Sequence, residues 1–355
     1  MKKRIVIALG HRALGTTLPE QKKAVKTSAA VLADMVEEGY QLVITHSNAP
    51  QVGMIHTAMN EFGKTHPDYT VAPMSVCSAM SQGYIGYDLQ NAVRAELLKR
   101  GIFKTVSTIL TQVIVDPYDD AFHHPVKVIG RYMDAKEAEA EEQKGNYVKE
   151  EPGKGYRRIV AAPMPKSIVE IDAIKTLVQN DQVVIACGGG GIPVLQQGNE
   201  LKGASAIIEK DYASGKLAEG VDADILMILT NDKMVDIDRD TEHPRFLEHI
   251  TVEEAKEHIA ADQFGVNSML PKICASVDFI TAGKGRSAII TNLENAIDAL
   301  KGKTGTIITD ETTFYGTMGG QQGDKGIISN ENGEFKVKDT IHLQGGKIGH
   351  VGVMT

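Results

Sequence analysis

The chain opens with an alternation of apolar runs and amphipathic segments. Residues 5–9 form a continuous apolar run, as expected for a strand that is covered on both faces. Over residues 21–38 apolar side chains recur at helical spacing, and Gly39 stands where a glycine commonly ends a helix. Residues 41–45 predict the next strand. Together they predict a βαβ unit, whose right-handed crossover implies parallel pairing of the two strands.

The alternation continues along the chain. Further apolar runs that predict strands lie at residues 105–116, 182–194, 223–229, 287–291 and 305–309. Helical patterns separate several of them. Strands that alternate with helices are typical of an α/β domain with helices on both faces of the sheet.

Two regions depart from this rhythm. Residues 117–165 are rich in charge, glycine and proline, and they predict an inserted lid or subdomain that adds no strand to the main sheet. A long solvated loop is the alternative, although such loops are uncommon in compact domains and are often functional. The tail, residues 310–355, carries "NENGEF", a plausible hairpin turn. This tail could form a clamp across a dimer, an added edge hairpin or a docking surface, and we expect a purely structural role.

Composition narrows the class of protein. A chain of 355 residues can form one large domain or two, and its net charge of −8 argues against general affinity for nucleic acid or anionic membranes. The 3 cysteines are far apart, with no CxxC pair and no histidine cluster at zinc-ligand spacing, so we predict reduced thiols and no metal site. The apolar run after "MKKR" is too short for a signal peptide or a membrane span. A cytoplasmic protein is expected.

Three loops are candidates for ligand binding because they follow strands, and open α/β sheets bind ligands beyond the carboxyl ends of their strands. They are "GHRALG" at 10–15, "HSNAPQVG" at 46–53 and "GGGG" at 188–191. Four glycines allow backbone N–H groups to approach an anion closely, but they could equally form a tight turn. The run is not a Walker loop, because no Lys-Ser/Thr follows it, and the chain has no GxGxxG motif.

Lysines could supply the charge that glycines cannot. Lys210 and Asp211 follow a short apolar run, and Lys272 stands in what looks like the first turn of a helix. Solvated surface charges are the alternative. A half-buried lysine, however, generally needs an anionic partner.

Taken together, the motifs resemble those of one family. They are "LVITHSNAPQVG", "SQGYIGYDLQNA", "LTQVIVDPYDDAF", "HPVKVIG", "GKGYRRIVAAPMPKSIVE", "ACGGGGIPV", "IIEKDYAS", "VDADILMILT" and "SMLPKICAS". In this order they resemble the carbamate kinases of the amino acid kinase superfamily, over residues 3–309. The resemblance implies a three-layer αβα sandwich with a mainly parallel central sheet, a protruding lid subdomain at 117–165 and a homodimer.

The resemblance also implies an activity. Carbamate kinases transfer a phosphoryl group between carbamoyl phosphate and ADP, giving ATP and carbamate, with Mg²⁺ bridging the nucleotide phosphates. Residues 1–116 and 166–215 would form the half that binds carbamate, and residues 216–309 the half that binds the nucleotide. A catabolic, ATP-forming role in arginine or purine and allantoin breakdown is implied, with a carbamoyltransferase as a possible partner.

Particular residues match the family's functional positions. The catalytic matches are Lys210, Asp211, Lys272 and Lys127. The substrate-binding matches are Gly10, His11, Arg12, Ser47, Asn48, Ala49, Gly189 and Gly190. The nucleotide-binding matches are Asp211, Thr230, Asn231, Ser268, Met269 and Lys272. By similarity, the lysines neutralise the transferred phosphoryl group and Asp211 holds them or the metal in position.

Two loops depart from the family pattern. Gly10-His11-Arg12 replaces Gly-Gly-Asn, and residues 46–51 read His-Ser-Asn-Ala-Pro-Gln in place of His-Gly-Asn-Gly-Pro-Gln. If the family's second glycine uses a positive φ, a histidine there costs about 1–2 kcal/mol. Arg12, in turn, adds a cation suited to carboxylate or phosphate. Smaller departures near the expected nucleotide site are Val266-Asn267 and Asn231-Asp232.

These departures leave three functions open. The first, which we take as the prediction, is a carbamate kinase. The second is a kinase for a different carboxylated or carbamoylated substrate, whose extra anionic group meets Arg12. The third is a non-catalytic paralogue that serves as a binding subunit. No nucleic acid or membrane partner is expected.

Overall fold

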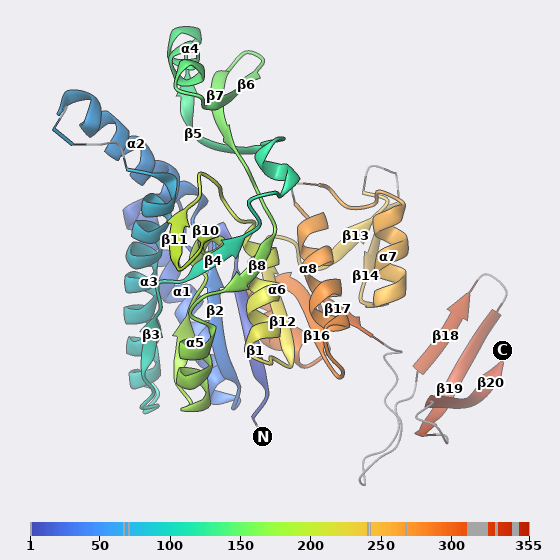
Figure 1. Ribbon diagram of the computed structural model, residues 1–355. Coiled ribbons are helices and arrows are strands. Elements are labelled where there is room, and N and C mark those ends of the chain that lie inside the picture. Colours follow the sequence, from blue (N-terminus) through green and yellow to red (C-terminus); the bar gives the residue numbers. More distant parts are fainter. Residues whose placement is uncertain are drawn as a thin grey trace.

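The computed structural model describes residues 2–66, 68–69, 72–239, 241, 243–266, 268–310, 326–330, 333–342 and 348–354. Its centre is an eight-stranded sheet with strand order β15-β17-β16-β12-β1-β2-β9-β3 (Figure 1). These strands are β1 (Arg4–Leu9), β2 (Gln41–His46), β3 (Val106–Thr108), β9 (Val183–Ile185), β12 (Ile225–Thr230), β15 (His249–Thr251), β16 (Ser287–Asn292) and β17 (Thr306–Thr309). All neighbours pair in parallel except β16 and β17.

Helices cover both faces of this sheet, which confirms the predicted αβα fold. One face carries α1 (Leu18–Glu37), α3 (Met74–Lys99) and α9 (Ala296–Leu300). The other carries α5 (Ile171–Gln179), α6 (Lys210–Gly220), α7 (Val252–Ala260) and α8 (Leu270–Thr281). Side chains of β1 alternate between the two cores, as the pleat of a strand requires: Val6 packs in one, and Ile5 and Ile7 pack in the other.

The first predicted helix begins earlier than its apolar spacing indicates. Thr17 and Glu20 form a capping box at the start of α1, in which each side chain meets the other residue's backbone N–H. At the other end Gly39 adopts a φ of +94°, as predicted for a glycine that ends a helix.

Two segments predicted as single strands are each divided in two. The first gives β3 and then β4 (Gln112–Val115), and the second gives β9 and then β10 (Ile192–Gln197). β4 and β10 belong to a second sheet, with order β11-β10-β4-β8, that includes β11 (Glu200–Gly203) and β8 (Pro165–Ile168). The second division occurs at Gly189, Gly190 and Gly191, whose φ angles of +65° to +91° cannot continue a strand.

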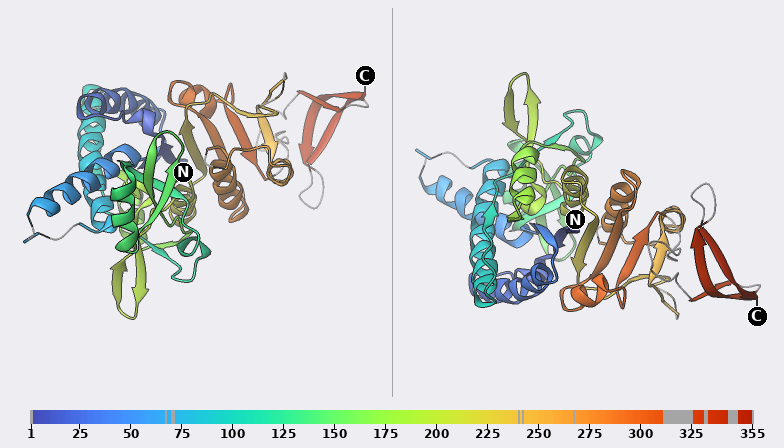
Figure 2. Two further views of the ribbon diagram at one scale, coloured as in Figure 1. Left: turned by 90° about the horizontal axis from the view of Figure 1, so that it is seen from above. Right: turned by 90° about the horizontal axis from the view of Figure 1, so that it is seen from below.

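The segment predicted as a lid has secondary structure of its own. Strands β5 (Lys127–Met133), β6 (Tyr147–Glu151) and β7 (Gly155–Val160) form an antiparallel sheet, with α4 (Ala135–Gln143) packed on it. None of these strands joins the main sheet. The unit projects above the body, next to α2 (Ala49–Thr65) (Figures 1 and 2). We call this unit, β5 to β7 with α4, the lid.

The remaining elements are a two-stranded ribbon, four short 3₁₀ turns and the sheet of the tail. A ribbon is formed by β13 (Val235–Ile237) and β14 (Arg245–Leu247), and short 3₁₀ turns are η1 (His11–Ala13), η2 (Asp120–Phe122), η3 (Gly188–Gly190) and η4 (Leu293–Asn295). In the tail, β18 (Gly326–Asn330), β19 (Gly333–His342) and β20 (Ile348–Met354) form a separate antiparallel sheet (Figure 2). β18 and β19 pair on either side of Glu331 and Asn332, the predicted turn, which lie outside the described residues.

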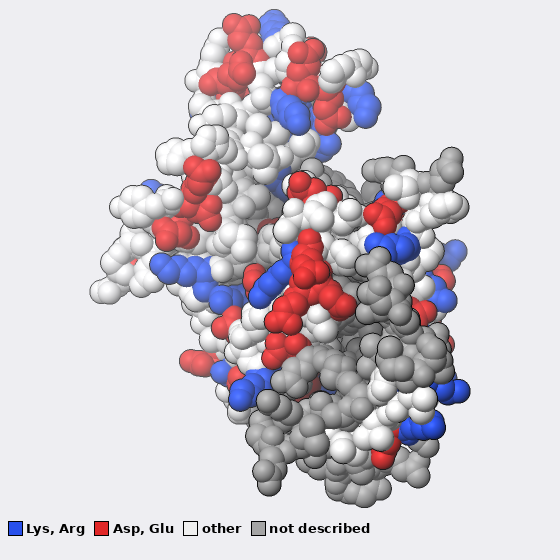
Figure 3. All heavy atoms as spheres, turned by 90° about the vertical axis from the view of Figure 1, so that its right-hand side faces the viewer, with Lys and Arg blue, Asp and Glu red and all other residues white. Residues whose placement is uncertain are grey.

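Two surface properties bear on function. On the face in Figure 3, acidic side chains gather near the centre and basic ones are scattered, so this face offers no continuous basic patch among the described residues. Among the same residues, no helix combines the length and apolar character needed to cross a bilayer.

Candidate active site

The starts of α6 and α8 hold a compact charged network. Lys210 Nζ lies 2.6 Å from Asp211 Oδ1, and Lys272 Nζ lies 2.7 Å from Asp211 Oδ2. Asp211 is buried, with 1% of its surface exposed. The sequence suggested that half-buried lysines would need an anionic partner, and Asp211 is that partner for both. We call these three residues the lysine–aspartate network.

Asp211 is held in its ionised form. Burial by itself would raise the pKa of Asp211, but the charges and hydrogen bonds of Lys210 and Lys272 outweigh it and lower this pKa to about 2. Lys272 also donates to the Ser268 carbonyl, which fixes its ammonium group at the start of α8. Two lysines at the N-termini of two helices make this region favourable for a phosphate group.

The run of glycines closes tightly around two polar side chains. A Cβ on Gly188 would lie 2.3 Å from His46 Nε2, and a Cβ on Gly189 would lie 2.0 Å from Asn48 Nδ2. A Cβ on Gly190 would lie 2.2 Å from the Ile208 carbonyl oxygen. The glycines are therefore required for close approach of this loop to the loop that follows β2.

Helix α3 forms hydrogen bonds to both the glycine loop and the loop that follows β2. Ser81 Oγ accepts a hydrogen bond of 2.8 Å from Asn48 Nδ2. Gln82 Nε2 donates to the carbonyls of Gly188 and Thr111, and Gln82 Oε1 accepts from the Thr111 backbone N–H. All these groups are buried, so the loops have one hydrogen-bonded arrangement.

His46 stays neutral beside the network. Burial lowers its pKa to about 4, and the positive charge of Lys210 acts in the same direction, against a hydrogen bond to the Ser47 carbonyl. A neutral ring adds no charge next to the lysines.

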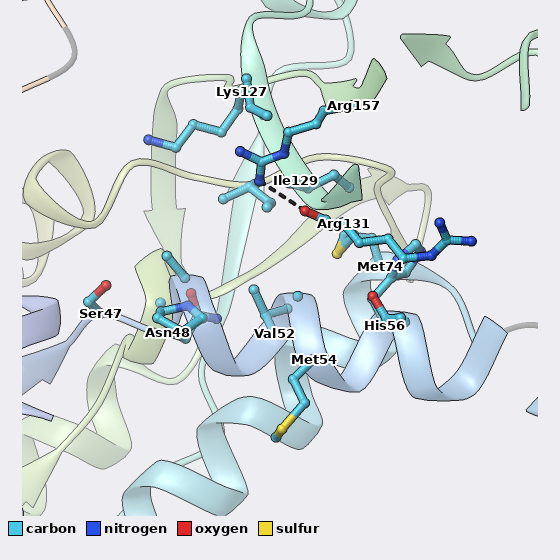
Figure 4. Close-up of a pocket in the computed structure, with 18 of the residues that line it drawn as sticks. Ser47, Asn48, Val52, Met54, His56, Met74, Lys127, Ile129, Arg131 and Arg157 are labelled. Atoms are coloured by element: carbon cyan, nitrogen blue, oxygen red, sulfur yellow. Dashed lines mark hydrogen bonds between the residues drawn. The ribbon is translucent and has the colours of Figure 1, made fainter. Parts of the chain in front are cut away.

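Beside the network, a cavity of about 740 Å³ opens between α2 and the lid (Figure 4). Ser47, Asn48, Ala49, Gly189 and Lys210 line one end of it. Lys127 projects from β5 over this end and forms an ion pair with Glu209. Six of the residues predicted from the sequence, these five and Lys127, thus surround one space.

The first loop lines a different cavity. Gly10 and Arg12 line a second cavity, of about 360 Å³, together with Thr230, Asn231 and residues of η4. His11 and Arg12 are exposed, and His11 is not among the described residues with a positive φ, so the strain expected for a histidine there is absent. Arg12 therefore does not share the space with Lys127 and Asn48.

The predicted nucleotide-binding residues are divided in the same way. Ser268 and Met269 directly precede α8 and thus lie beside Lys272, whereas Thr230 and Asn231 lie beside Arg12. Asn267 lies outside the described residues. Within the described part of the chain, no group of three His, Cys, Asp or Glu side chains is arranged to hold a metal ion.

Some residues of the site had not been expected from the sequence. Glu209, the partner of Lys127, stands next to Lys210 in "IIEKDYAS", so its position was a usable signal. Ser81 and Gln82 fall in a motif quoted for the resemblance, but nothing in it indicates that they hold two distant loops. Arg157 reaches the cavity only because β7 pairs with β5.

Comparisons with known proteins agree with this fold. Residues 3–292 match the model of the "Amino acid kinase family". The class of protein is therefore that of the amino acid kinases.

Individual relatives narrow the class. The chain is 49% identical to the "Carbamate kinase-like protein YqeA" of Escherichia coli strain K12, over 87% of this chain and 99% of that one. It is 46% identical to the carbamate kinase of Pyrococcus horikoshii, over 87% and 100%. The solved structure "Carbamate kinase from Giardia lamblia bound to AMP-PNP" superimposes with a TM-score of 0.82 at 36% identity, over 87% of this chain and 98% of that one. The chain belongs to the carbamate kinase family.

Proposed function

We propose that this protein is a carbamate kinase-like phosphotransferase that catalyses the reversible reaction of ATP and carbamate to ADP and carbamoyl phosphate, working in the ATP-forming direction. The lysine–aspartate network at the end of the 740 Å³ cavity is the observation that carries the proposal. Similarity to carbamate kinases at 46% identity supports it.

The network suits phosphoryl transfer because this reaction needs alignment and charge neutralisation more than covalent help from the protein. The bond between phosphorus and the carbamoyl oxygen breaks, a bond to a terminal oxygen of ADP forms, and carbamate leaves. Lys210 and Lys272 neutralise the oxygens of the phosphoryl group in flight. Asp211 acts as a positioning residue that fixes both ammonium groups, and Lys127 adds charge from the lid.

The two halves divide the substrates. Residues 1–116 and 166–215 bind the carbamoyl group, residues 216–309 bind the nucleotide, and the lid region 117–165 covers the site. Ser268, Met269 and Lys272 lie at the start of α8, where the helix N-terminus favours nucleotide phosphates. The nucleotide phosphates themselves would hold Mg²⁺, which would neutralise part of their charge, since magnesium is usually held by one or two carboxylates and by substrate oxygens.

The test is ATP formation from ADP and carbamoyl phosphate with Mg²⁺. We expect turnover on the order of 1–1,000 per second, typical of enzymes. Lys210→Ala should lower it by roughly a hundred- to a thousandfold, as the loss of one preorganised charge stabiliser does. The matched control is Lys216→Ala on the same helix, because Lys216 pairs with Glu219 on the surface. Equal losses in both variants would contradict the assignment.

A second candidate is a kinase for another carboxylated or carbamoylated substrate. It is favoured by Ser47 and Ala49, which replace two family glycines at the wall of the cavity. A protein that binds ADP but forms ATP from no acyl phosphate would instead be a binding subunit, with a carbamoyltransferase as its proposed partner.

The assembly proposed is a homodimer. Val76, Met80 and Tyr87 form an exposed row on α3, and 43%, 43% and 68% of these side chains remain accessible. Their spacing places them on one helix face. Light scattering of the native chain and of Met80→Lys tests this surface.

A cytoplasmic location is part of the same proposal, because Cys77, Cys187 and Cys274 are free thiols.

A further inference from the structure

The cavity between α2 and the lid is larger than carbamate requires. Its volume of about 740 Å³ falls in the range of roughly 300–1,000 Å³ that pockets for drug-sized ligands have. It follows α2 from Asn48 to His56, which is about 12 Å of helix at the usual rise per residue. A carbamoyl group ends one bond beyond its carbonyl carbon and fills only the end near Lys210.

The walls beyond that end are apolar. Val52 of α2, Met74 at the start of α3, Ile129 of the lid and Ile207 all line the cavity. Figure 4 shows Val52 on one side and Ile129 on the other. Walls of this kind hold ordered water poorly and are stabilised when an apolar group covers them.

These walls are fixed in place rather than left by a loose lid. Val52, Met74, Ile129 and Val160 belong to one buried apolar cluster that joins α2 and α3 to β5 and β7. Only 3%, 5% and 6% of Val52, Met74 and Ile129 are exposed, so their packing anchors the roof of the cavity to its floor, and each presents one fixed edge to the cavity.

The far end of the cavity offers no unused charge among the described residues. Arg131 pairs with Glu137. Arg157 donates to the Gly130 carbonyl, lies 4.0 Å from a Glu151 oxygen and stacks over Tyr132. His56 meets Arg158 and Asn60. A ligand that reaches this end thus needs no second anionic group.

We propose that the acceptor site takes acyl phosphates and carboxylates that carry an uncharged apolar substituent, with the acyl group beside Lys210 and Asn48 and the substituent along the cavity-facing edges of Val52, Met74, Ile129 and Ile207. This inference rests on the proposed function, because it places the phosphoryl group at the lysine–aspartate network. The transfer is the same as with carbamoyl phosphate: the bond from phosphorus to the acyl oxygen breaks, ADP receives the phosphoryl group and the substituted carboxylate leaves.

The first experiment measures dissociation constants of acetate, butyrate and hexanoate for the full chain with MgADP, by calorimetry. Affinity should rise by up to about fourfold for each added CH₂ group, the increment for full burial. Adipate, as long as hexanoate but charged at both ends, should bind more weakly than hexanoate. No gain from acetate to hexanoate, or tighter binding of adipate, overturns the proposal.

A filled cavity provides the matched variant. Gly53 lines the cavity, and a Cβ there would meet nothing closer than the Gly130 nitrogen at 4.0 Å, so Gly53→Leu projects into the space without a clash at its first atom. The change also replaces a helical glycine, which favours the folded state. Gly83→Leu on α3 is the control, because Gly83 is exposed and a Cβ there meets nothing within 4 Å. The gain in affinity for each added CH₂ group should vanish in Gly53→Leu and persist in Gly83→Leu. If it persists in both variants, the substituent does not bind in this cavity, and the proposal is overturned.

ATP formation from ADP with carbamoyl, acetyl and butyryl phosphate distinguishes a failure of this inference from a failure of the proposed kinase function. Turnover of carbamoyl phosphate without any preference for butyryl over acetyl phosphate leaves the proposed function standing and overturns the inference. Turnover of none of the three overturns both. A rise in kcat/KM from acetyl to butyryl phosphate that Gly53→Leu abolishes supports both.

Discussion

The two ends of the site hold their cations in different ways. At the starts of α6 and α8, Lys210 and Lys272 share one buried carboxylate, and only 11% and 16% of their side chains are exposed. In the lid, Lys127 pairs with Glu209, and Arg131 pairs with Glu137 and Glu61; 35% and 44% of the two cationic side chains are exposed. Exposed pairs contribute little and rearrange readily, whereas a buried shared carboxylate allows one arrangement. The phosphoryl end is thus preorganised by a buried charge network, whereas the apolar walls of the acyl end are held by packing and not by ion pairs.

Removing the shared carboxylate is the strongest test of this contrast. Asp211→Asn leaves two cations side by side without their counter-charge, and we expect a loss of about 3–5 kcal/mol in the free energy of unfolding. ATP formation should fall at the same time by roughly a hundred- to a thousandfold. Denaturant unfolding and initial rates measure the two effects.

Asp278→Asn is the control for that change. Asp278 lies exposed on α8 and takes part in none of the described salt bridges. If both variants lost the same stability, the network would not be the rigid end of the site.

Titration of His46 gives the next largest effect. Because the folded pKa of His46, about 4, is below the ordinary histidine value of 6.5, the unfolded chain binds a proton that the folded chain does not between these two pH values. Stability from this group is complete above pH 6.5 and declines by about 3 kcal/mol as the pH falls to 4. Unfolding free energies measured at pH 7 and pH 4.5 should show this slope, and His46→Asn should reduce it. His124→Asn, at an exposed position, should leave the slope intact.

A smaller change tests the glycine loop between the two ends. Gly190→Ala places a methyl group against the Ile208 carbonyl at a φ of +91°, and we expect a loss of about 2 kcal/mol. Gly198→Ala has a similar backbone, with φ at +60°, but open space around it, so it measures the backbone strain alone. Thermal unfolding of the two variants compares them; equal shifts would mean that close approach of the loop costs nothing.

The smallest expected effect is at the tail. β18, β19 and β20 pair only with one another among the described strands, and the chain's similarity to its relatives covers 87% of its length. A chain ending at Asp310 should change the unfolding free energy of the body by less than about 0.5 kcal/mol. A larger loss would show that the tail supports the site.

Much of this architecture follows from the sequence because the signals are local. The capping box at Thr17, the positive φ at Gly39 and the apolar runs of the main sheet depend on neighbouring residues alone. The need of two lysines for an anionic partner was also visible, since burial of charge follows one rule everywhere.

The rest depends on contacts between distant segments. Whether Arg12 faces the acyl group depends on the direction in which η1 leaves the end of β1. The spacing of residues along the chain does not determine that direction. The same holds for Gln82, a polar residue on a helix whose buried face holds two loops. The cavity is formed between α2 and the sheet of the lid, so no single sequence motif predicts it.

The clamp formed by Gln82 has a consequence for the order of folding. Its hydrogen bonds join residues 29 and 106 positions away along the chain. Closing such loops costs chain entropy before any contact offsets it, and contacts of high sequence separation slow folding. We therefore expect the glycine loop to acquire its shape only after α3 has docked on the sheet, and the site to be among the last parts of the molecule to form.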